Sequence, residues 1–183
     1  MGRASLISYA KFFEAVKPLF GKFTQDQVEA LDFLLIKAQA FTDVKHKAYF
    51  MATIFHETDK TMRPIVEYGK GKGKPYGKPG KYLGIPYGRG YIQLTWDDNY
   101  EKADRELGLN GSLTKSFERA LEPEIAAQIA VRGMKEGWFT GKKLSDYDNY
   151  VSMRKVINGR DRAYDIADYA KVFEKAFNTI PKP

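Results

Sequence analysis

Apolar residues recur every three or four positions over most of the chain, which is the spacing of a helix that buries one face. The clearest stripe is the last one, formed by Ala163, Ile166, Ala170, Phe173 and Phe177. The pattern predicts helices at residues 4–16, 24–38, 47–58, 96–107, 123–138, 147–157 and 161–177. No repeat or linker interrupts this series, so we expect one mainly α-helical domain over residues 1–183.

Several predicted helices carry local signals at their ends. Thr24 and Gln27 have the spacing of a capping box, in which each side chain hydrogen-bonds the other residue's backbone. Thr95 is a good N-cap for the helix that follows it. The first helix is expected to stop near Pro18 and Gly21, and the sixth at Asn158-Gly159.

Residues 69–90 break the helical pattern, because eight glycines alternate there with lysine, proline and tyrosine. This density of glycine and proline predicts a loop. The sequence at 91–94 then alternates between apolar and polar residues, which predicts a short, half-buried strand. Such a strand would leave Gln93 and Thr95 on its polar side.

The positive charge is concentrated around this loop. The whole chain has 30 basic and 23 acidic residues, a net charge of +7. Between residues 60 and 90 the only acid is Glu67, and the rest of the chain is neutral overall. The eight basic residues there are Lys60, Arg63, Lys70, Lys72, Lys74, Lys78, Lys81 and Arg89. Such a run is either a solvated loop or a surface for nucleic acid, a membrane or an acidic polymer.

Other features of the sequence exclude whole classes of protein. The chain has no cysteine, which excludes a disulfide framework and Cys-ligated metal sites. Lys11 and Glu14 interrupt the apolar residues near the N-terminus, so we expect no signal peptide. The apolar runs are too short to span a membrane.

The sequence His56-Glu57-Thr58 offers carboxylate chemistry in place of metal chemistry. The zinc motif H-E-x-x-H fails, because Lys60 stands at its fifth position and His46 is the only other histidine. Glu57 and Glu67 lie on separate predicted elements and could face each other across a cleft. Inverting glycosidases use such a pair, with the carboxyl groups about 6.5–9.5 Å apart. Both could equally be solvated surface residues, and His56 a histidine that supports the helix end.

Three motifs, in order along the chain, resemble the family 19 chitinase-like glycoside hydrolases. The longest is the stretch 87–95, Tyr-Gly-Arg-Gly-Tyr-Ile-Gln-Leu-Thr, which is followed by Asn99-Tyr100. The segment 52–58 resembles the helix that carries that family's general acid, and 156–159 its Ile-Asn-Gly segment. The compact length, the lack of cysteine and the sequence Gly-Trp-Phe-Thr-Gly at 137–141 are similar to the phage endolysin branch.

The resemblance implies a catalytic role for three residues. Glu57 would be the general acid, Glu67 the general base, and Thr95 would hold the attacking water. One position departs from the family, which has a glycine soon after His-Glu-Thr where this chain has Asp59-Lys60.

The resemblance also implies substrate contacts. Gln93, Asn99 and Asn158 would hydrogen-bond the sugars. His56 would support the neighbouring acid and is also counted among the substrate-binding residues. Asn158 could instead be only a helix stop, since Asn-Gly is common there.

From these observations we expect a lysozyme-like, two-lobed helical domain with a small β element around residues 60–95 beside the cleft. The expected activity is that of an endolysin that hydrolyses β-1,4 bonds of bacterial peptidoglycan with inversion, without cofactor or metal. The positive loop favours peptidoglycan, which carries carboxylates, over neutral chitin.

The alternatives are a chitinase acting on chitin oligomers, a nucleic-acid-binding protein that uses the basic loop, and a wall-binding module without activity. With the endolysin reading we expect a monomeric, single catalytic domain without a separate wall-binding module. It would bind no nucleic acid, contact anionic surfaces weakly through residues 60–90, and stay in the host cytoplasm until release to the wall.

Overall fold

The computed structural model describes residues 3–182, with side chains from Tyr9 onward. Met1, Gly2 and Pro183 lie outside the described residues, and so does the side chain of Leu6, which belongs to the apolar stripe of the first predicted helix. The start of the segment considered as a signal peptide therefore also lies outside them.

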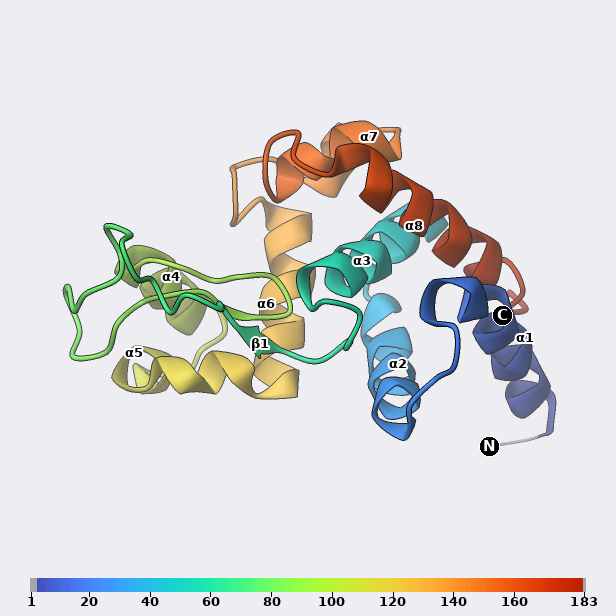
Figure 1. The fold of residues 1–183 in the computed structure, drawn as a ribbon, viewed down its shortest axis with the longest axis horizontal. Coiled ribbons are helices and arrows are strands. Elements are labelled where there is room, and N and C mark those ends of the chain that lie inside the picture. The colour runs from blue at the N-terminus through green and yellow to red at the C-terminus, as the bar shows by residue number, and fades with distance from the viewer. Residues whose placement is uncertain (1–2, 183) are drawn as a thin grey trace.

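The described residues are mainly helical, with one small antiparallel sheet (Figure 1). The α-helices are α1 (Arg3–Phe20), α2 (Gln25–Ala38), α3 (Val44–Glu57), α4 (Asp97–Glu106), α5 (Ser112–Lys115), α6 (Pro123–Glu136), α7 (Tyr150–Met153) and α8 (Ala163–Phe177). The shorter elements are the 3-10 helices η1 (Phe117–Leu121), η2 (Leu144–Asp146) and η3 (Arg154–Val156), and the strands β1 (Ile65–Val66) and β2 (Arg89–Gly90). The predicted fold class, a helical domain with a small β element, is confirmed.

Two separate apolar cores give the molecule two lobes. The larger core is built mainly from α1, α2, α3 and α8, and the smaller one from α4, α5, η1 and part of α6. Helix α6 contributes to both, with Ala127 and Ala130 in the larger core and Ile125 and Ile129 in the smaller one. Figure 1 shows α6 between the two groups of helices. The lobes are therefore joined along one shared helix.

Helix α3 is the central element of the larger lobe. Every residue from Ala48 to Phe55 is buried, and α8 packs along the helix. The apolar stripe predicted for the last helix is confirmed, since each of its five members is buried in α8. Truncating a fully buried aromatic such as Phe173 typically costs about 3–5 kcal/mol. This packing fixes the end of α3, where Glu57 stands.

The end of α1 and the start of α2 can be compared with the stop and capping signals in the sequence. The predicted capping box is confirmed, because Thr24 Oγ1 accepts the N–H of Gln27 at 3.1 Å and Gln27 Oε1 accepts the N–H of Thr24 at 3.0 Å. The predicted stop near Pro18 and Gly21 is confirmed, although the helix runs beyond Val16, its predicted last residue. The helix continues to Phe20 and closes with a 2.8 Å hydrogen bond from Gly21 N to Lys17 O, so the proline removes one donor without stopping the helix.

The predicted strand at 91–94 is wrong, because the chain turns back on itself there. The N–H of Leu94 donates to Arg89 O at 3.0 Å, and that of Arg89 donates to Leu94 O at 3.3 Å. Gly90 has φ 116°, which a residue with a Cβ rarely adopts, and it allows the tight turn. The predicted alternation of buried and exposed side chains is still present, since Ile92 and Leu94 are buried while Gln93 and Thr95 are partly exposed.

Two other helix predictions need correction. Thr95 is not the N-cap of α4, because Trp96 occupies that position and no side chain caps the helix. The helix predicted at 147–157 is broken into α7 and η3. In the second case the chain tightens from α to 3-10 geometry at Arg154, whose side chain turns inward to α3.

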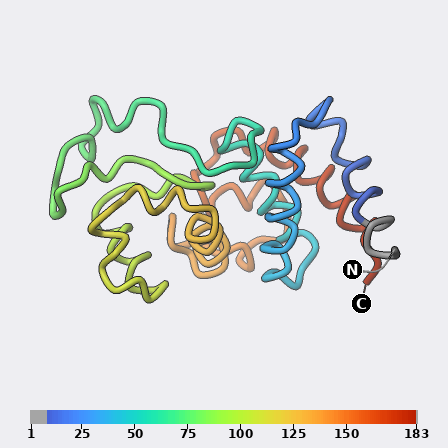
Figure 2. The backbone as a smooth tube through the Cα atoms, turned by 90° about the horizontal axis from the view of Figure 1, so that it is seen from below, coloured from blue at the N-terminus to red at the C-terminus, as the bar shows by residue number. Residues whose placement is uncertain are grey.

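The small sheet pairs the two ends of the glycine-rich loop. Ile65 lies opposite Gly90 and Val66 opposite Arg89 in an antiparallel register. The intervening loop, residues 67–88, extends to one end of the molecule (Figure 2). It is a chain of hydrogen-bonded turns, as in the 2.8 Å bond from Lys72 N to Gly69 O. Among residues 3–182, no helix is both long and apolar enough to cross a membrane.

Candidate active site

A cavity of about 400 Å³ lies where the two lobes meet. Five separate chain segments line it: the end of α3, the turn after β2, the start of α4, the residues after α6 and the residues after η3. Its lining residues are Glu57, Ile92, Gln93, Leu94, Thr95, Trp96, Asn99, Trp138, Phe139, Ile157 and Asn158. The cavity thus brings together five of the seven residues singled out in the sequence, Glu57, Gln93, Thr95, Asn99 and Asn158.

Glu57 is held in this cavity by Arg154. The guanidinium of Arg154 donates to Glu57 Oε1 at 2.8 Å and to the backbone oxygen of Asp161 at 2.7 Å. Arg154 is only 2% exposed and Glu57 is 20% exposed, so the pair reaches from the core to the cavity surface. Within the described residues Glu57 Oε2 has no hydrogen-bond donor, which leaves this oxygen able to face a ligand.

Arg154 was not singled out from the sequence, although one signal was available. It falls on the apolar stripe formed by Tyr150, Met153 and Ile157, at the spacing of buried helix positions. A charged residue at such a position is rarely buried without a partner. The carboxylate that it meets lies 97 residues earlier, so the partner was not predictable from local sequence.

His56 lies beside Glu57 but does not line the cavity. Its ring packs against Tyr169 of α8, with the ring centroids 6.4 Å apart. Burial lowers the pKa of His56, the nearby Glu57 acts in the opposite direction, and Arg154 lowers it further. The described geometry therefore shows a histidine that supports the end of α3, and a direct substrate contact stays a prediction.

Glu67 does not line the cavity either, because its carboxylate fastens the glycine-rich loop. Oε1 accepts the N–H of Gly71 at 3.0 Å and the hydroxyl of Tyr76 at 3.3 Å, and Oε2 accepts the N–H of Gly88 at 2.8 Å. The bond to Gly88 joins the two ends of the loop, and the other two hold its first turns. The role of Glu67 as a base stays a prediction beside this visible structural role.

The polar side chains of the cavity wall are set by the turn after β2. Gln93 donates through Nε2 to Ile65 O at 3.3 Å, and a Cβ added to Gly88 would stand 2.2 Å from Gln93 Oε1. A larger residue at position 88 would therefore displace Gln93. Asn99 donates through Nδ2 to the backbone oxygen of Thr95 at 2.7 Å. This bond does not involve the Thr95 hydroxyl.

The comparisons with known proteins place this geometry on a known fold. No family model matches the sequence, and no curated protein matches it. Among solved structures, the chain is similar to chitinase C from Streptomyces griseus HUT6037, with 21% sequence identity and a TM-score of 0.66. The match covers 100% of this chain and 80% of the chitinase chain.

The chain has a chitinase-like fold. At this level of identity the likeness concerns the fold alone, because one fold can carry many different chemistries. In this chitinase-like fold the cavity lies between two lobes with separate cores, which is the common position of a ligand site.

One residue of the cavity wall has an unusual backbone. Trp96 has φ 75° and ψ 139°, a region that side chains with a Cβ avoid. Such conformations cost about 1–3 kcal/mol and persist where the surroundings fix them. Here Trp96 N donates to Pro86 O at 2.9 Å, and Trp96 O accepts from Asn99 N and Tyr100 N at 3.1 Å each. Trp96 is also 48% exposed, in contrast to Trp138 at 8%.

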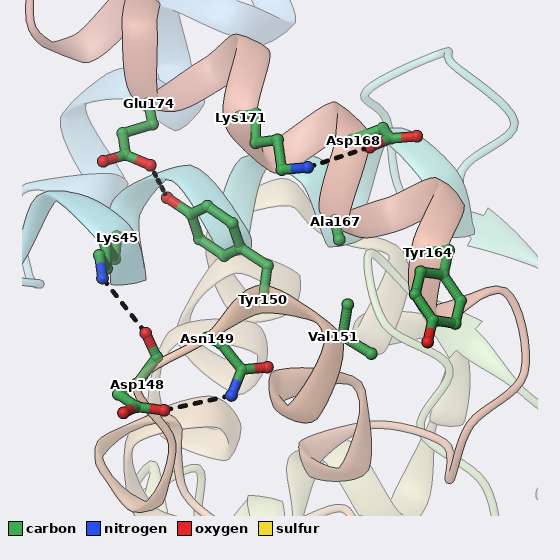
Figure 3. Close-up of a pocket in the computed structure, with 10 residues that line it drawn as sticks. All are labelled: Lys45, Asp148, Asn149, Tyr150, Val151, Tyr164, Ala167, Asp168, Lys171 and Glu174. Atoms are coloured by element: carbon green, nitrogen blue, oxygen red, sulfur yellow. Dashed lines mark hydrogen bonds and ion pairs between the residues drawn. The ribbon is translucent and has the colours of Figure 1, made fainter.

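A second cavity of about 420 Å³ lies on the larger lobe of the chitinase-like fold, between α7, α8 and the start of α3 (Figure 3). Three of its charged groups, Glu174, Lys171 and Lys45, already have polar partners within the cavity wall. Tyr150 donates to Glu174 Oε2 at 2.5 Å, Lys171 contacts Asp168 at 3.4 Å, and Lys45 donates to Asp148 O at 3.2 Å. Because these charged groups already have partners, this cavity offers less chemistry than the one that contains Glu57.

The part of the chain that the structure describes contains no group of three or more His, Cys, Asp or Glu side chains arranged to hold a metal ion.

Because the fold lowers the pKa of His56, we expect the stability of the protein to depend on pH. In the unfolded chain His56 takes up a proton near its ordinary pKa of about 6.5, whereas the folded protein resists that proton. Stability should therefore fall as the pH drops below about 6.5, because the unfolded state then binds more protons. Thermal unfolding between pH 7.5 and 5.5 should show this slope, and His56→Gln should reduce it. The same series on His46→Gln assigns the slope to one histidine, and an unchanged slope in His56→Gln would contradict the prediction.

Proposed function

We propose that the protein is a glycoside hydrolase of the phage endolysin type that cuts β-1,4 bonds in bacterial peptidoglycan. The observation that carries the proposal is the cavity between the lobes of a chitinase-like fold, which is lined by Glu57 together with Thr95, Asn99 and Gln93. A carboxylate opposite hydroxyl and amide groups can protonate a leaving oxygen while its neighbours hold the sugar. The three sequence motifs support the same proposal independently of the fold.

The proposed reaction uses two carboxyl groups. Glu57 gives its proton to the glycosidic oxygen as the bond from that oxygen to the anomeric carbon breaks. A water molecule held by Thr95 attacks the anomeric carbon from the opposite side, and Glu67 takes the proton that this water loses. The net change is the addition of one water across the bond, with inversion at the anomeric carbon. Arg154 is the positioning residue that orients Glu57.

The choice of peptidoglycan rests on which charges of the segment 60–90 are free. Arg63 contacts Asp26 at 3.2 Å, Lys81 pairs with Glu101, and Arg89 contacts Glu118 at 2.7 Å. Within the described residues no carboxylate lies within 4 Å of the ammonium groups of four exposed lysines of the loop, Lys70, Lys72, Lys74 and Lys78. The four unpaired ammonium groups would attract the carboxylates of peptidoglycan stem peptides, whereas neutral chitin has no negative charge for them to attract.

The second candidate is a chitinase that acts on chitin oligomers. The observation that favours it is the fold match to a chitinase, together with a cavity wall built from neutral amide and hydroxyl groups. Hydrolysis rates on neutral oligomers and on purified walls, measured side by side, separate the two candidates.

The proposal extends to the setting in which the protein works. We propose a monomeric, single-domain enzyme that stays in the host cytoplasm until it reaches the wall. Turbidity of outer-membrane-permeabilised cells should fall on addition of the protein, and a gel shift with DNA or RNA at physiological salt should be absent. Nucleic-acid binding without lysis would contradict the proposed function.

The free lysines give a prediction about ionic strength. Exposed charges act over about 10 Å at 0.1 M salt, so wall binding and lysis should weaken as salt rises. Replacing Lys70, Lys72, Lys74 and Lys78 with Gln should lower wall lysis at low salt by about tenfold, the lower end of electrostatic effects on association. Hydrolysis of a short neutral chitooligosaccharide should change little. Both rates are measured on the same preparation.

A matched control removes the same charge elsewhere. Four exposed lysines outside the segment are Lys11, Lys22, Lys115 and Lys182. Their joint replacement with Gln should leave the low-salt rate on walls nearly unchanged. Equal losses in both quadruple variants would mean that net charge alone matters, and no loss in the loop variant would mean that its lysines only solvate the loop.

A further inference from the structure

Trp96 is the exposed large apolar side chain of the cavity between the lobes. Among the side chains that the structure describes, the other exposed large hydrophobic residues, Ile36, Tyr68, Leu83 and Tyr164, do not line that cavity. Trp96 stands there beside Thr95 and Asn99, with nearly half of its surface open to solvent. An indole left exposed among polar groups loses the free energy that its burial would give. The exposure therefore suggests a partner that covers the ring.

The backbone conformation of Trp96 is a second indication that this side chain contacts a ligand. With φ 75° and ψ 139°, this position suits glycine, which would adopt the conformation without strain. The chain nevertheless has its bulkiest residue type there. Strained positions of this kind cluster at ligand sites, where the side chain has a role that the fold alone does not require. The strain and the exposure are separate observations on one residue.

The indole of Trp96 is also held in place by a neighbouring aromatic ring. The ring of Tyr76 meets it edge to face, with the centroids 5.2 Å apart and the planes at 71°. The hydroxyl of Tyr76 in turn donates to Glu67 Oε1 at 3.3 Å. Trp96 is thus linked through Tyr76 to the carboxylate that fastens the loop. A ring held in advance loses little conformational freedom on binding.

We propose that Trp96 is a sugar-stacking platform, on which the apolar C–H face of one N-acetylated sugar ring of the substrate rests. Aromatic rings offer the flat apolar surface that such a face needs, and the amide and hydroxyl groups of Gln93, Thr95 and Asn99 lie on the same wall for the polar edge of the sugar. This inference rests on the proposed function, because it names how that site holds its glycan.

The experiment separates binding from turnover. In a Glu57→Gln background, which should bind glycan without cutting it, titration calorimetry with soluble glycan strands and with chitohexaose gives the affinity. Trp96→Gly should weaken it by about tenfold, the usual effect of removing an aromatic anchor. Its melting temperature should stay equal or rise, because glycine relieves the strain. Trp96→Phe should keep the affinity within a few-fold.

Two further variants exclude a purely structural explanation. Trp96→Leu keeps an apolar side chain against Tyr76 but has no flat ring, and should also lose affinity. Asn110→Gly relieves another positive φ, 53°, at an exposed residue that does not line the cavity, and should leave affinity unchanged.

Two results would overturn the platform and leave the proposed function intact. One is unchanged glycan affinity in Trp96→Gly, and the other is a loss of affinity that comes with a lower melting temperature and is restored by Trp96→Leu. If the Glu57→Gln protein binds no glycan and the wild-type protein cuts none, the proposed function itself fails, and the platform fails with it.

Discussion

Replacing Glu57 with Gln is expected to leave a folded protein that has lost nearly all of its wall-lysing activity. Loss of a general acid lowers the rate by about 10²–10⁴-fold. The fold should survive because the amide oxygen of Gln can accept the same N–H of Arg154 that Glu57 Oε1 accepts at 2.8 Å. Circular dichroism and thermal melting check the fold, and release of reducing ends from purified peptidoglycan gives the rate.

The control for this variant is a nearby carboxylate outside the cavity. Asp59 is exposed, does not line the cavity and has a positive φ of 50° that Asn tolerates. Asp59→Asn should keep the wild-type rate. A Glu57→Gln protein that retains more than about a tenth of the activity would rule out Glu57 as the acid, since general acid catalysis typically contributes about 10²–10⁴-fold.

The second large effect is expected for Glu67. If Glu67 is the base, Glu67→Ala should lower the rate by about 10²–10⁴-fold. Sodium azide should restore part of the rate, because azide attacks the anomeric carbon without needing a base. The first product from a soluble oligosaccharide should have the inverted configuration, which NMR of the newly formed anomer reads directly.

The loop-fastening bonds of Glu67 require separate controls. Tyr76→Phe removes the hydroxyl that contacts Glu67 but keeps the ring beside Trp96, so it should cost little activity. Glu67→Gln keeps an acceptor for one of the backbone N–H groups of Gly71 and Gly88. A loss in Glu67→Ala that azide does not restore, and that Glu67→Gln repairs, would show that Glu67 only fastens the loop. A retained configuration would mean a nucleophile mechanism.

The helical fold could be predicted because its signals are local. The stripe of α8 and the capping box at Thr24 depend on residues three or four positions apart, and both appear in the structure as expected. The segment 147–157 has the same periodicity and was predicted wrongly. There the inward turn of Arg154 toward Glu57 changes the local geometry, and this contact spans 97 residues.

The candidate site shows the same limit. Sequence motifs singled out five residues that the structure brings into one cavity, Glu57, Gln93, Thr95, Asn99 and Asn158. They did not indicate Arg154 or Trp96, because burial and backbone conformation are set by the packed fold. Thr95 looks like a helix N-cap in sequence, yet the cap position is taken by Trp96, and Thr95 lines the cavity instead.

The charge pattern also changes meaning once the structure is known. The sequence gives every basic residue of the segment 60–90 equal weight. In the structure Arg89 is buried against Glu118, and Arg63 pairs with acids of α2, so these two serve the fold. Lys81 is paired with Glu101, and the exposed Lys60 stands over the ring of Phe55 just after α3. The salt prediction therefore concerns the four lysines of the loop turns that no carboxylate pairs, Lys70, Lys72, Lys74 and Lys78.

Mass spectrometry of purified peptidoglycan after digestion tests the central claim most directly. The proposal predicts soluble fragments with new reducing ends on an amino sugar and intact stem peptides, and no such fragments with Glu57→Gln. The identity of the sugar at the new end names the bond that is cut. Cleavage within the peptides, or no new reducing ends on peptidoglycan while chitin oligomers are hydrolysed, would contradict the claim that this protein cuts the glycan strands of the bacterial wall.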